Sequence, residues 1–346
     1  MRRAHRPTTA TLSFLTVFLI IFGTLYALSE TIAPLFAKDR ARINTFYQQT
    51  PHLDALALGH SHNFALSFEH LNLNGYHFWF PGSDLIETAV FTKTALAHLR
   101  TKKQAPRYLL IPLDYTFWAQ NNANNPTWKT KRLRYTFALQ KLGHLIPFEN
   151  EIKNAFIAPL LPVIRPDHWS GVLNAIVPFE EHPNAAITST GMDLNRQESV
   201  WPKDKQAKEA RSASVTIDIY RHSLAHNKEN KTAFESVLAS IISLAGESTL
   251  IFYTPPYTQG YTDFINRNNP ELIDKFEQAT KALPLRPQDR YWNFATMTSL
   301  SQDRSLFYDP THLNRRGAEV FAVVFRERLD ELEGTLVGEA ARRWGK

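Results

Sequence analysis

The sequence DALALGHSHN, residues 54–63, changes over a few positions from an apolar run to a polar one. Because short apolar runs closed by glycine are typical of buried parallel strands, we expect a strand over Asp54–Leu58. Gly59 permits a tight turn without a Cβ clash, and helical spacing follows over Asn63–Leu71. Ser61 is therefore expected at a sheet edge beside a helix N-terminus, where free N–H groups favour an anion.

The alternation of strand and helix continues along most of the chain. Further strands are expected at His77–Phe80, Tyr108–Leu113, Thr249–Tyr253 and Tyr291–Phe294. Helices are expected at Asp84–Arg100, Ala233–Leu244, Tyr261–Leu283 and Arg315–Leu332. The third strand is apolar on both faces, as a central parallel strand should be. This pattern predicts an α/β fold in which helices cover both faces of a parallel sheet.

One segment, Thr116–Ser214, interrupts this alternation of strands and helices. It is rich in Asn, Pro, Trp and His, and its periodicity is weak. We interpret it as one long insertion above the carboxyl edge of the sheet, where α/β folds bind ligands. The expected organisation is one folded domain over residues 51–335, which includes the insertion, and a C-terminal tail over residues 336–346.

The N-terminal region has the pattern of a membrane signal. No charged residue occurs from Thr11 to Leu28, and roughly 18 apolar residues just cross a bilayer core. Three arginines precede this run, so the positive-inside rule predicts a cytoplasmic tail over residues 1–10 and a single-pass anchor over residues 11–28. A helical connector over residues 29–50 then leads to an extracytoplasmic or periplasmic domain. A cleaved signal peptide is the alternative, because Ala27-Leu28-Ser29 resembles a cleavage site.

The composition excludes several classes of protein. The chain has 346 residues with a formal net charge of +6, and its hydrophobic fraction of 43% is ordinary for a globular protein. The basic residues do not gather in one run, so we expect solvated surface and no nucleic-acid partner. The absence of cysteine excludes disulfides and thiolate metal sites.

A second motif, LFYDPTHLN at residues 306–314, lies near the end of the chain. Its Asp309 and His312 are three positions apart, so the carboxylate could hold the imidazole in one tautomer and leave the other ring nitrogen as a base. Taken alone, a D-x-x-H pattern is more often a turn Asp and a loop His. A lone Gly-x-Ser, likewise, more often supplies a helix N-cap than a nucleophile.

The two motifs in this order resemble the SGNH/GDSL hydrolase superfamily. Residues 309–317 match its last block closely, and residues 59–61 match its first block with His60 where Asp is usual. The resemblance covers about Asp54–Leu113 and Thr249–Leu332 but not the insertion. It implies a three-layer, flavodoxin-like α/β fold with a parallel sheet, here preceded by a transmembrane helix.

The resemblance also implies roles for individual residues. Ser61 would be the nucleophile, His312 the general base and Asp309 the group that orients it. The backbone N–H of Ser61 would help to bind the oxyanion. Gly82 is the candidate for a second donor, and Gly75 is the alternative.

The third family block is where this sequence departs from the pattern. The family usually carries an Asn after the third strand, whereas this chain has IPLDY at residues 111–115. Asp114 would repel an oxyanion if it were ionised. Asn121 and Asn122 could reach the site only by folding back, so the third oxyanion donor is unassigned.

Histidines near the first motif raise the question of a metal site; they are His52, His60, His62, His70 and His77. They lack a recognised ligand spacing such as H-E-x-x-H. In an extended chain, strand alternation would also point His60 and His62 away from Ser61. We therefore expect no metal and no cofactor.

Together these observations predict serine-dependent acyl-ester chemistry, as an esterase or O-acyltransferase, on an envelope or exported polysaccharide. Anchored proteins of this layout resemble the partners of polysaccharide O-acetylation and teichoic-acid D-alanylation, which implies a multi-pass membrane acyltransferase as a partner. A lipid-ester hydrolase is a further option. The alternative from another class is a non-catalytic accessory protein that binds a polysaccharide or the acyltransferase through its insertion. His60 and the missing Asn favour that alternative, whereas Ser61 and the D-x-x-H motif oppose it.

Overall fold

The computed structural model describes residues 13–21, 23–24, 38–49, 52–119, 205–224 and 227–344. The chain divides into two compact units, Met1–Asn44 with Arg132–Ala186, and Thr45–Lys131 with Ile187–Lys346. In the first unit, residues 13–21 of the predicted anchor are helical and exposed. Among the described residues, no helix has the length and apolar character needed to span a bilayer.

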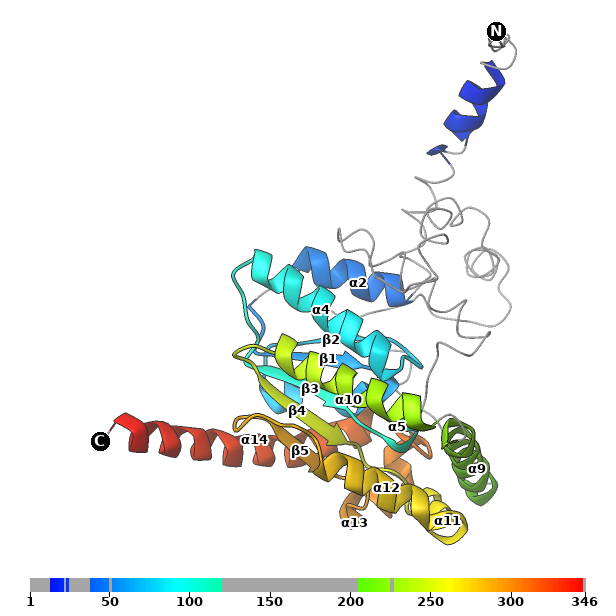
Figure 1. Ribbon diagram of the computed structural model, residues 1–346, viewed down its shortest axis with the longest axis vertical. Coiled ribbons are helices and arrows are strands. Elements are labelled where there is room, and N and C mark those ends of the chain that lie inside the picture. Colours follow the sequence, from blue (N-terminus) through cyan, green and yellow to red (C-terminus); the bar gives the residue numbers. More distant parts are fainter. Residues whose placement is uncertain are drawn as a thin grey trace. The chain divides into compact units, whose positions relative to one another are not determined.

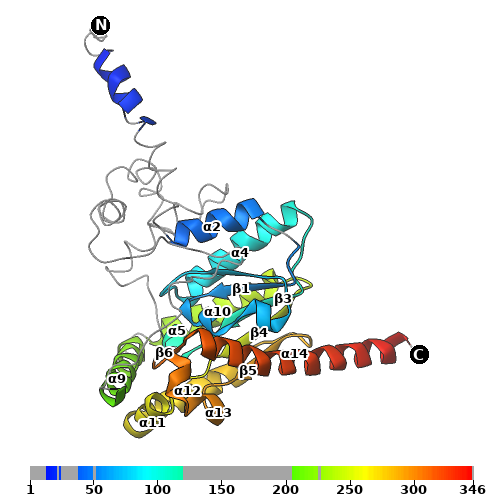
Figure 2. The same cartoon turned by 180° about the vertical axis from the view of Figure 1, so that it is seen from behind.

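The second unit is built on a five-stranded sheet in the order β2-β1-β3-β4-β5. The strands are β1 (Ala55–Gly59), β2 (Gly75–Trp79), β3 (Tyr108–Pro112), β4 (Thr249–Thr254) and β5 (Arg290–Asn293). All neighbouring pairs are parallel, which confirms the predicted α/β class and its parallel sheet (Figures 1 and 2). The predicted strands all form, with bounds shifted by one or two residues.

Helices cover both faces of this sheet. Figures 1 and 2 show α4 (Leu85–Thr101) and α10 (Asn227–Leu244) on one face and α14 (Arg315–Trp344) on the other. On the α14 side, Phe321, Phe325 and Leu329 pack on inward-facing strand residues such as Tyr108 and Tyr253. The predicted tail over residues 336–346 is instead helical up to Trp344, as part of α14.

The start of α4 shows why its sequence predicted a helix so clearly. The Asp84 side chain accepts a hydrogen bond from the Glu87 backbone N–H, and the Glu87 carboxylate accepts one from the Asp84 N–H. This capping box satisfies N–H groups that a helix start otherwise leaves unpaired, and it contributes about 1 kcal/mol. It begins α4 directly after the Gly82 turn, at the edge of the sheet where β1 and β2 end.

Two predicted helices are each divided in the structure. The helix expected over Asn63–Leu71 is a 3-10 helix η1 (Ser61–Ala65) and a short α3 (Phe68–Leu71), separated by the extended Leu66. The helix expected over Tyr261–Leu283 is α11 (Gln259–Asn268) followed by α12 (Pro270–Lys281). Proline has no N–H and disfavours a helical residue before it, so the break falls at Asn269.

The predicted insertion contains more regular structure than its weak periodicity suggested. Its described ends form α5 (Tyr115–Ala119) and the first part of α9 (Lys205–Leu224), while residues 120–204 lie outside the described part. The buried Glu209 of α9 accepts two hydrogen bonds from the Arg304 guanidinium, at 2.9 and 2.7 Å. This bidentate pair fixes α9 beside the loop that carries the second motif.

The second motif forms a small hairpin ahead of α14. The chain passes through α13 (Thr298–Ser301) and η5 (Arg304–Leu306) into β6 (Phe307–Asp309) and β7 (His312–Leu313), which pair antiparallel. Asn314 follows, and its side-chain oxygen accepts from the Gly317 N–H at 2.9 Å while its N–H donates to the Leu306 carbonyl. The hairpin is thereby held against the first turn of α14.

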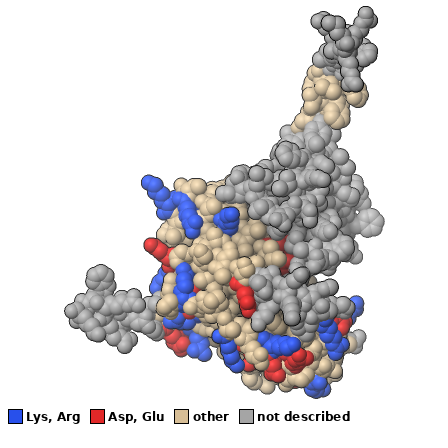
Figure 3. Space-filling view, viewed as in Figure 1, with Lys and Arg blue, Asp and Glu red and all other residues tan. Residues whose placement is uncertain are grey.

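Charged side chains are mixed on the face of the molecule drawn in Figure 3. Lys and Arg lie among Asp and Glu, including over α11 and α12, where Glu271–Lys275 and Glu277–Lys281 form i,i+4 pairs. This agrees with the expectation of solvated, scattered charge on the described surface.

Candidate active site

The residues predicted to form a catalytic triad lie together at the carboxyl end of the sheet. The Ser61 hydroxyl lies 2.7 Å from His312 Nε2, although the two residues are 251 positions apart in the chain. The other ring nitrogen of His312, Nδ1, lies 2.9 Å from both carboxylate oxygens of Asp309. This geometry allows His312 to take a proton from Ser61 while Asp309 holds the ring.

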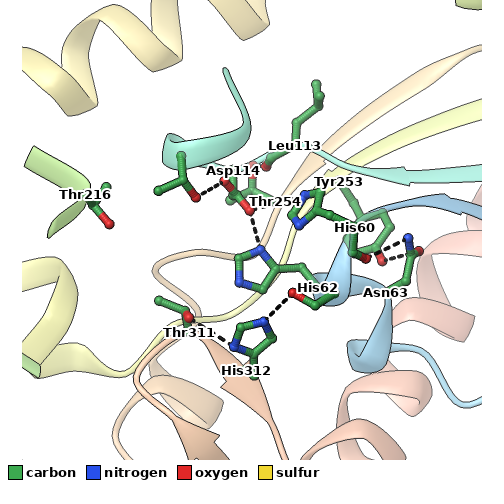
Figure 4. Close-up of polar contacts among 12 residues, drawn as sticks. His60, His62, Asn63, Leu113, Asp114, Thr216, Tyr253, Thr254, Thr311 and His312 are labelled. Atoms are coloured by element: carbon green, nitrogen blue, oxygen red, sulfur yellow. Dashed lines mark hydrogen bonds and ion pairs between the residues drawn. The ribbon is translucent and has the colours of Figure 1, made fainter. Parts of the chain in front are cut away.

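The turn after β1 places the serine. Gly59 has φ +113°, a conformation that strongly favours glycine, and an added Cβ would lie 3.3 Å from Pro112 Cδ. The buried Asn63 side chain donates to the Leu58 and His60 carbonyls, and its oxygen accepts from the Tyr253 hydroxyl at 3.1 Å. The turn is thus fixed from both sides, and Asn63 is a structural residue of the site (Figure 4).

The hairpin places the base. Asp309 Oδ1 accepts hydrogen bonds from the backbone N–H groups of Thr311 and His312, each at 2.9 Å. Burial raises the pKa of Asp309, but the charge of His312 and these hydrogen bonds outweigh it and hold that pKa well below its usual range. An ionised Asp309 favours the His312 tautomer with its proton on Nδ1, which leaves Nε2 to accept from Ser61.

The state of Asp309 gives a prediction for the pH dependence of activity. Because its pKa is depressed, Asp309 remains ionised as the pH falls, and we expect it to add no inflection to the profile of kcat/KM above about pH 4. Below neutral pH, the profiles of kcat/KM for wild type and Asp309→Asn should therefore show no difference that is due to titration of Asp309. A profile of p-nitrophenyl acetate turnover measures this, and a carboxylate inflection above pH 4 that disappears in Asp309→Asn would contradict it.

The structure separates the two candidates for the second oxyanion donor. Gly82 has φ +66° and lines the same pocket as Ser61 and His312. Gly75 begins β2 and pairs with Ala55, at the end of the strand away from Ser61, where the Phe68 ring would overlap an added Cβ. Gly82 is therefore positioned for the role and Gly75 is not.

A pocket of roughly 200 Å³ opens beside the Ser61 hydroxyl. One wall comes from α9 and α11, through Ser212, Val215, Thr216 and Tyr261. The Thr216 and Tyr261 hydroxyls are 2.9 Å apart and tie these two helices together. The sequence analysis did not predict this wall, although the buried Ala213, Ile217 and Tyr220 follow helical spacing in α9 and could have revealed the helix.

Two histidines contact Asp114, the residue that stands where the third family block usually has Asn. His62 Nδ1 is hydrogen-bonded to Asp114 Oδ2, and His60 Nε2 lies 3.3 Å from the same oxygen (Figure 4). Both histidines line the pocket with Ser61, and the orientation expected for an extended chain does not apply here. The reason is that η1 begins at Ser61 and curls the chain, whereas the prediction assumed an extended one.

This cluster is deeply buried and strongly polar. Asp114, His60 and His62 are 1%, 5% and 6% exposed. Burial raises the pKa of Asp114, but the two histidines and the hydrogen bonds from His62 and Thr116 hold it well below its usual range. Burial lowers the pKa of His60 to about 3, against the opposing effect of Asp114. Asp114 is therefore a carboxylate beside the pocket, and His60 is neutral at pH 7.

The same three side chains have the composition of a metal site. Their nitrogen and oxygen ligand atoms all lie within 4.8 Å of one another, the one such group among the described residues. The other histidines near the motif do not join it. His52 and His70 are exposed, and His77 lies buried in β2 with its ring against Phe68. Asn121 and Asn122 lie outside the described residues.

Comparison with known proteins does not assign this chain to a family. No family model matches the chain, and no curated protein matches it.

Proposed function

We propose that this protein carries out serine-dependent acyl-ester chemistry, with Ser61 as nucleophile, His312 as general base and Asp309 as the orienting carboxylate. The observation that carries the proposal is the continuous chain of contacts from Ser61 through both ring nitrogens of His312 to Asp309. These three residues lie at the carboxyl end of a parallel sheet, as expected for a three-layer fold of the SGNH/GDSL type. We propose that fold type because of the two sequence motifs.

The reaction proceeds through an acyl-serine. Ser61 Oγ attacks the ester carbonyl as His312 Nε2 takes the hydroxyl proton, and the carbonyl oxygen becomes an oxyanion. Collapse of this intermediate breaks the ester C–O bond, and the leaving alcohol takes the proton from His312. A second hydroxyl, from water or a sugar, then gives its proton to His312 as its oxygen attacks the acyl carbonyl. The bond between the acyl carbon and Ser61 Oγ breaks, and Ser61 takes the proton back from His312.

The oxyanion requires donors aimed at the carbonyl oxygen. The backbone N–H groups of Ser61 and Gly82 are the proposed donors, since both residues line the pocket. The side chain at the position of the missing Asn, Asp114, supplies an anion to the neighbourhood instead of a donor.

The pocket wall is compatible with a carbohydrate substrate. Its lining includes the hydroxyl-bearing residues Ser83, Thr116, Ser212, Thr216 and Thr311. Such groups hydrogen-bond sugar hydroxyls as donors or acceptors. With the apolar N-terminal run and its arginines, this supports an envelope or exported polysaccharide as substrate and a membrane-anchored extracytoplasmic location. A multi-pass acyltransferase as partner is proposed from the resemblance of the two motifs to anchored SGNH proteins.

One observation favours a second candidate, a non-catalytic accessory protein of the same fold. The Asp114 carboxylate, next to the pocket, would oppose a developing oxyanion. An accessory protein would bind a polysaccharide or the acyltransferase without needing the serine to react.

Labelling with a fluorophosphonate distinguishes the two candidates. We expect the full-length chain to be labelled on Ser61, because an activated serine attacks the phosphorus and loses its proton to His312. Ser61→Ala should not be labelled, and His312→Ala should be labelled much more slowly. Equal labelling of wild type and Ser61→Ala would overturn Ser61 as the nucleophile, and no labelling of the folded wild type would favour the accessory role. Peptide mapping of the labelled chain identifies the modified residue.

A further inference from the structure

The polar cluster behind Ser61 consists of the side-chain types that bind transition-metal ions. Two imidazoles and one carboxylate, from His60, His62 and Asp114, converge from the end of β1 and the end of β3. Three protein ligands of this kind, with a further position open to water or substrate, are typical of catalytic zinc sites. All three are buried, in contrast to the solvated acidic groups that commonly gather without a ligand.

One spacing in the cluster matches that of two ligands on a single ion. Two atoms about 2.1 Å from a tetrahedral ion lie about 3.4 Å from each other. His60 Nε2 and Asp114 Oδ2 are 3.3 Å apart, whereas His62 Nδ1 is directly hydrogen-bonded to Asp114 Oδ2. An ion would replace the hydrogen bond between His62 and Asp114, which requires a small rotation of one side chain.

Binding of an ion requires one change in the hydrogen bonds of the cluster, at the contact between His62 Nδ1 and Asp114 Oδ2. His62 Nδ1 is hydrogen-bonded to the Asp114 carboxylate, so this nitrogen would bind an ion after its proton has moved to Nε2. That nitrogen is free to receive it, since it has no hydrogen-bond partner among the described residues.

His62 Nε2, which the proposed ion would not occupy, is buried without a hydrogen-bond partner among the described residues. A buried polar atom normally has a partner, and an unpaired one costs roughly 1–3 kcal/mol. His62 is only 6% exposed, yet it lines the pocket, and Figure 4 shows its ring between Asp114 and His312. Its ring centroid is 4.4 Å from that of His312, so whatever binds His62 also adjoins the triad.

We propose that His60, His62 and Asp114 bind one divalent transition-metal ion of the Zn²⁺ class, with its open coordination position facing the Ser61 pocket. Imidazole and carboxylate together suit Zn²⁺ and its first-row neighbours better than Mg²⁺ or Ca²⁺, which prefer oxygen ligands. The proposed catalytic role of the ion rests on the proposed function, whereas its binding does not.

The ion would change the sign of the charge near Asp114, the residue at the position of the missing Asn. Without it, Asp114 places a negative charge where an acyl transfer develops an oxyanion. With it, the cluster carries a net positive charge, which stabilises an oxyanion in place of an Asn donor. The same site would thus keep Ser61 chemistry and account for Asp114, His60 and His62 together.

A cobalt titration of the full-length chain tests the proposal. After dialysis against a chelator, we expect the wild type to bind one Co²⁺ per chain, with visible d–d bands that Zn²⁺ abolishes by displacement. Asp114→Asn and His60→Gln should each weaken this binding by more than about 100-fold, since loss of a ligand exceeds the loss of an outer contact. Zn²⁺ should also raise the Tm of the wild type but not of the variants.

His70→Gln is the matched control, because His70 is an exposed histidine outside the cluster. It should retain the cobalt spectrum and the Zn²⁺-dependent rise in Tm. A wild type without cobalt bands, or Asp114→Asn and His60→Gln variants that bind as tightly as wild type, would overturn the metal site. Fluorophosphonate labelling of Ser61 is measured separately on the same samples. Failure of the proposed serine chemistry and failure of the proposed metal site therefore give different results.

Discussion

Replacement of Ser61 by alanine in the full-length chain is expected to lower kcat/KM for p-nitrophenyl acetate by at least about 10⁴-fold. The serine hydroxyl is the group within 2.7 Å of His312 Nε2, and without it the base has no nucleophile to activate. Because the two residues act as a unit, His312→Ala and the double variant should show losses of similar size. Steady-state release of p-nitrophenol measures all three.

Ser67→Ala is the matched control for this experiment. Ser67 Oγ also lies 2.9 Å from a histidine nitrogen, Nδ1 of His70, but that pair lies outside the pocket. Its replacement should leave turnover within about twofold of wild type, as for a surface change. Undiminished turnover in Ser61→Ala would remove the assigned nucleophile, and an inactive but folded wild type would favour the accessory protein.

Gly317→Ala is expected to destabilise the fold by at least about 3 kcal/mol and to lower activity with it. Gly317 lies in the first turn of α14, where an added Cβ would overlap the carbonyl oxygen of Leu306. That carbonyl also accepts the Asn314 N–H, so it cannot move without displacing the hairpin that carries Asp309 and His312. Urea unfolding gives the free-energy change, and p-nitrophenyl acetate turnover reports the displaced base.

Gly334→Ala provides the comparison within the same helix. Gly334 has no heavy atom within 4 Å of an added Cβ, so its replacement should stabilise α14 by up to about 1 kcal/mol. A Gly317→Ala variant as stable as Gly334→Ala would show that the close approach of α14 to the hairpin is not needed for folding.

The parts of this molecule that the sequence predicted well are those governed by local rules. Short runs rich in apolar and aromatic residues become the strands, and the helix expected from Asp84 forms as α4, which begins with a capping box of Asp84 and Glu87. The site residues Ser61, Asp309 and His312 were predicted from motif order, and the structure brings their side chains into contact.

The features that the sequence did not predict depend on contacts between distant segments. His60 and His62 were expected to point away from Ser61 if the chain there was extended, but a 3-10 helix follows β1 and both rings contact Asp114. Asp114 is 52 positions from His62, so no spacing rule links them. The α9 wall is held by a contact of Glu209 with Arg304, 95 positions away, which a pattern search within one window does not detect.

The wide separation of Ser61 from His312 also has a consequence for the newly made protein. The ribosome completes β1 and its serine early, but the hairpin with Asp309 and His312 is made only after about nine-tenths of the chain, since His312 is residue 312 of 346 and lies 251 positions after Ser61. Until then the serine has no base and is a poor nucleophile. If Ser61 is the nucleophile as proposed, nascent and prematurely terminated chains are expected to lack its reactivity, which would require α14 to pack on the sheet and hold the hairpin in place.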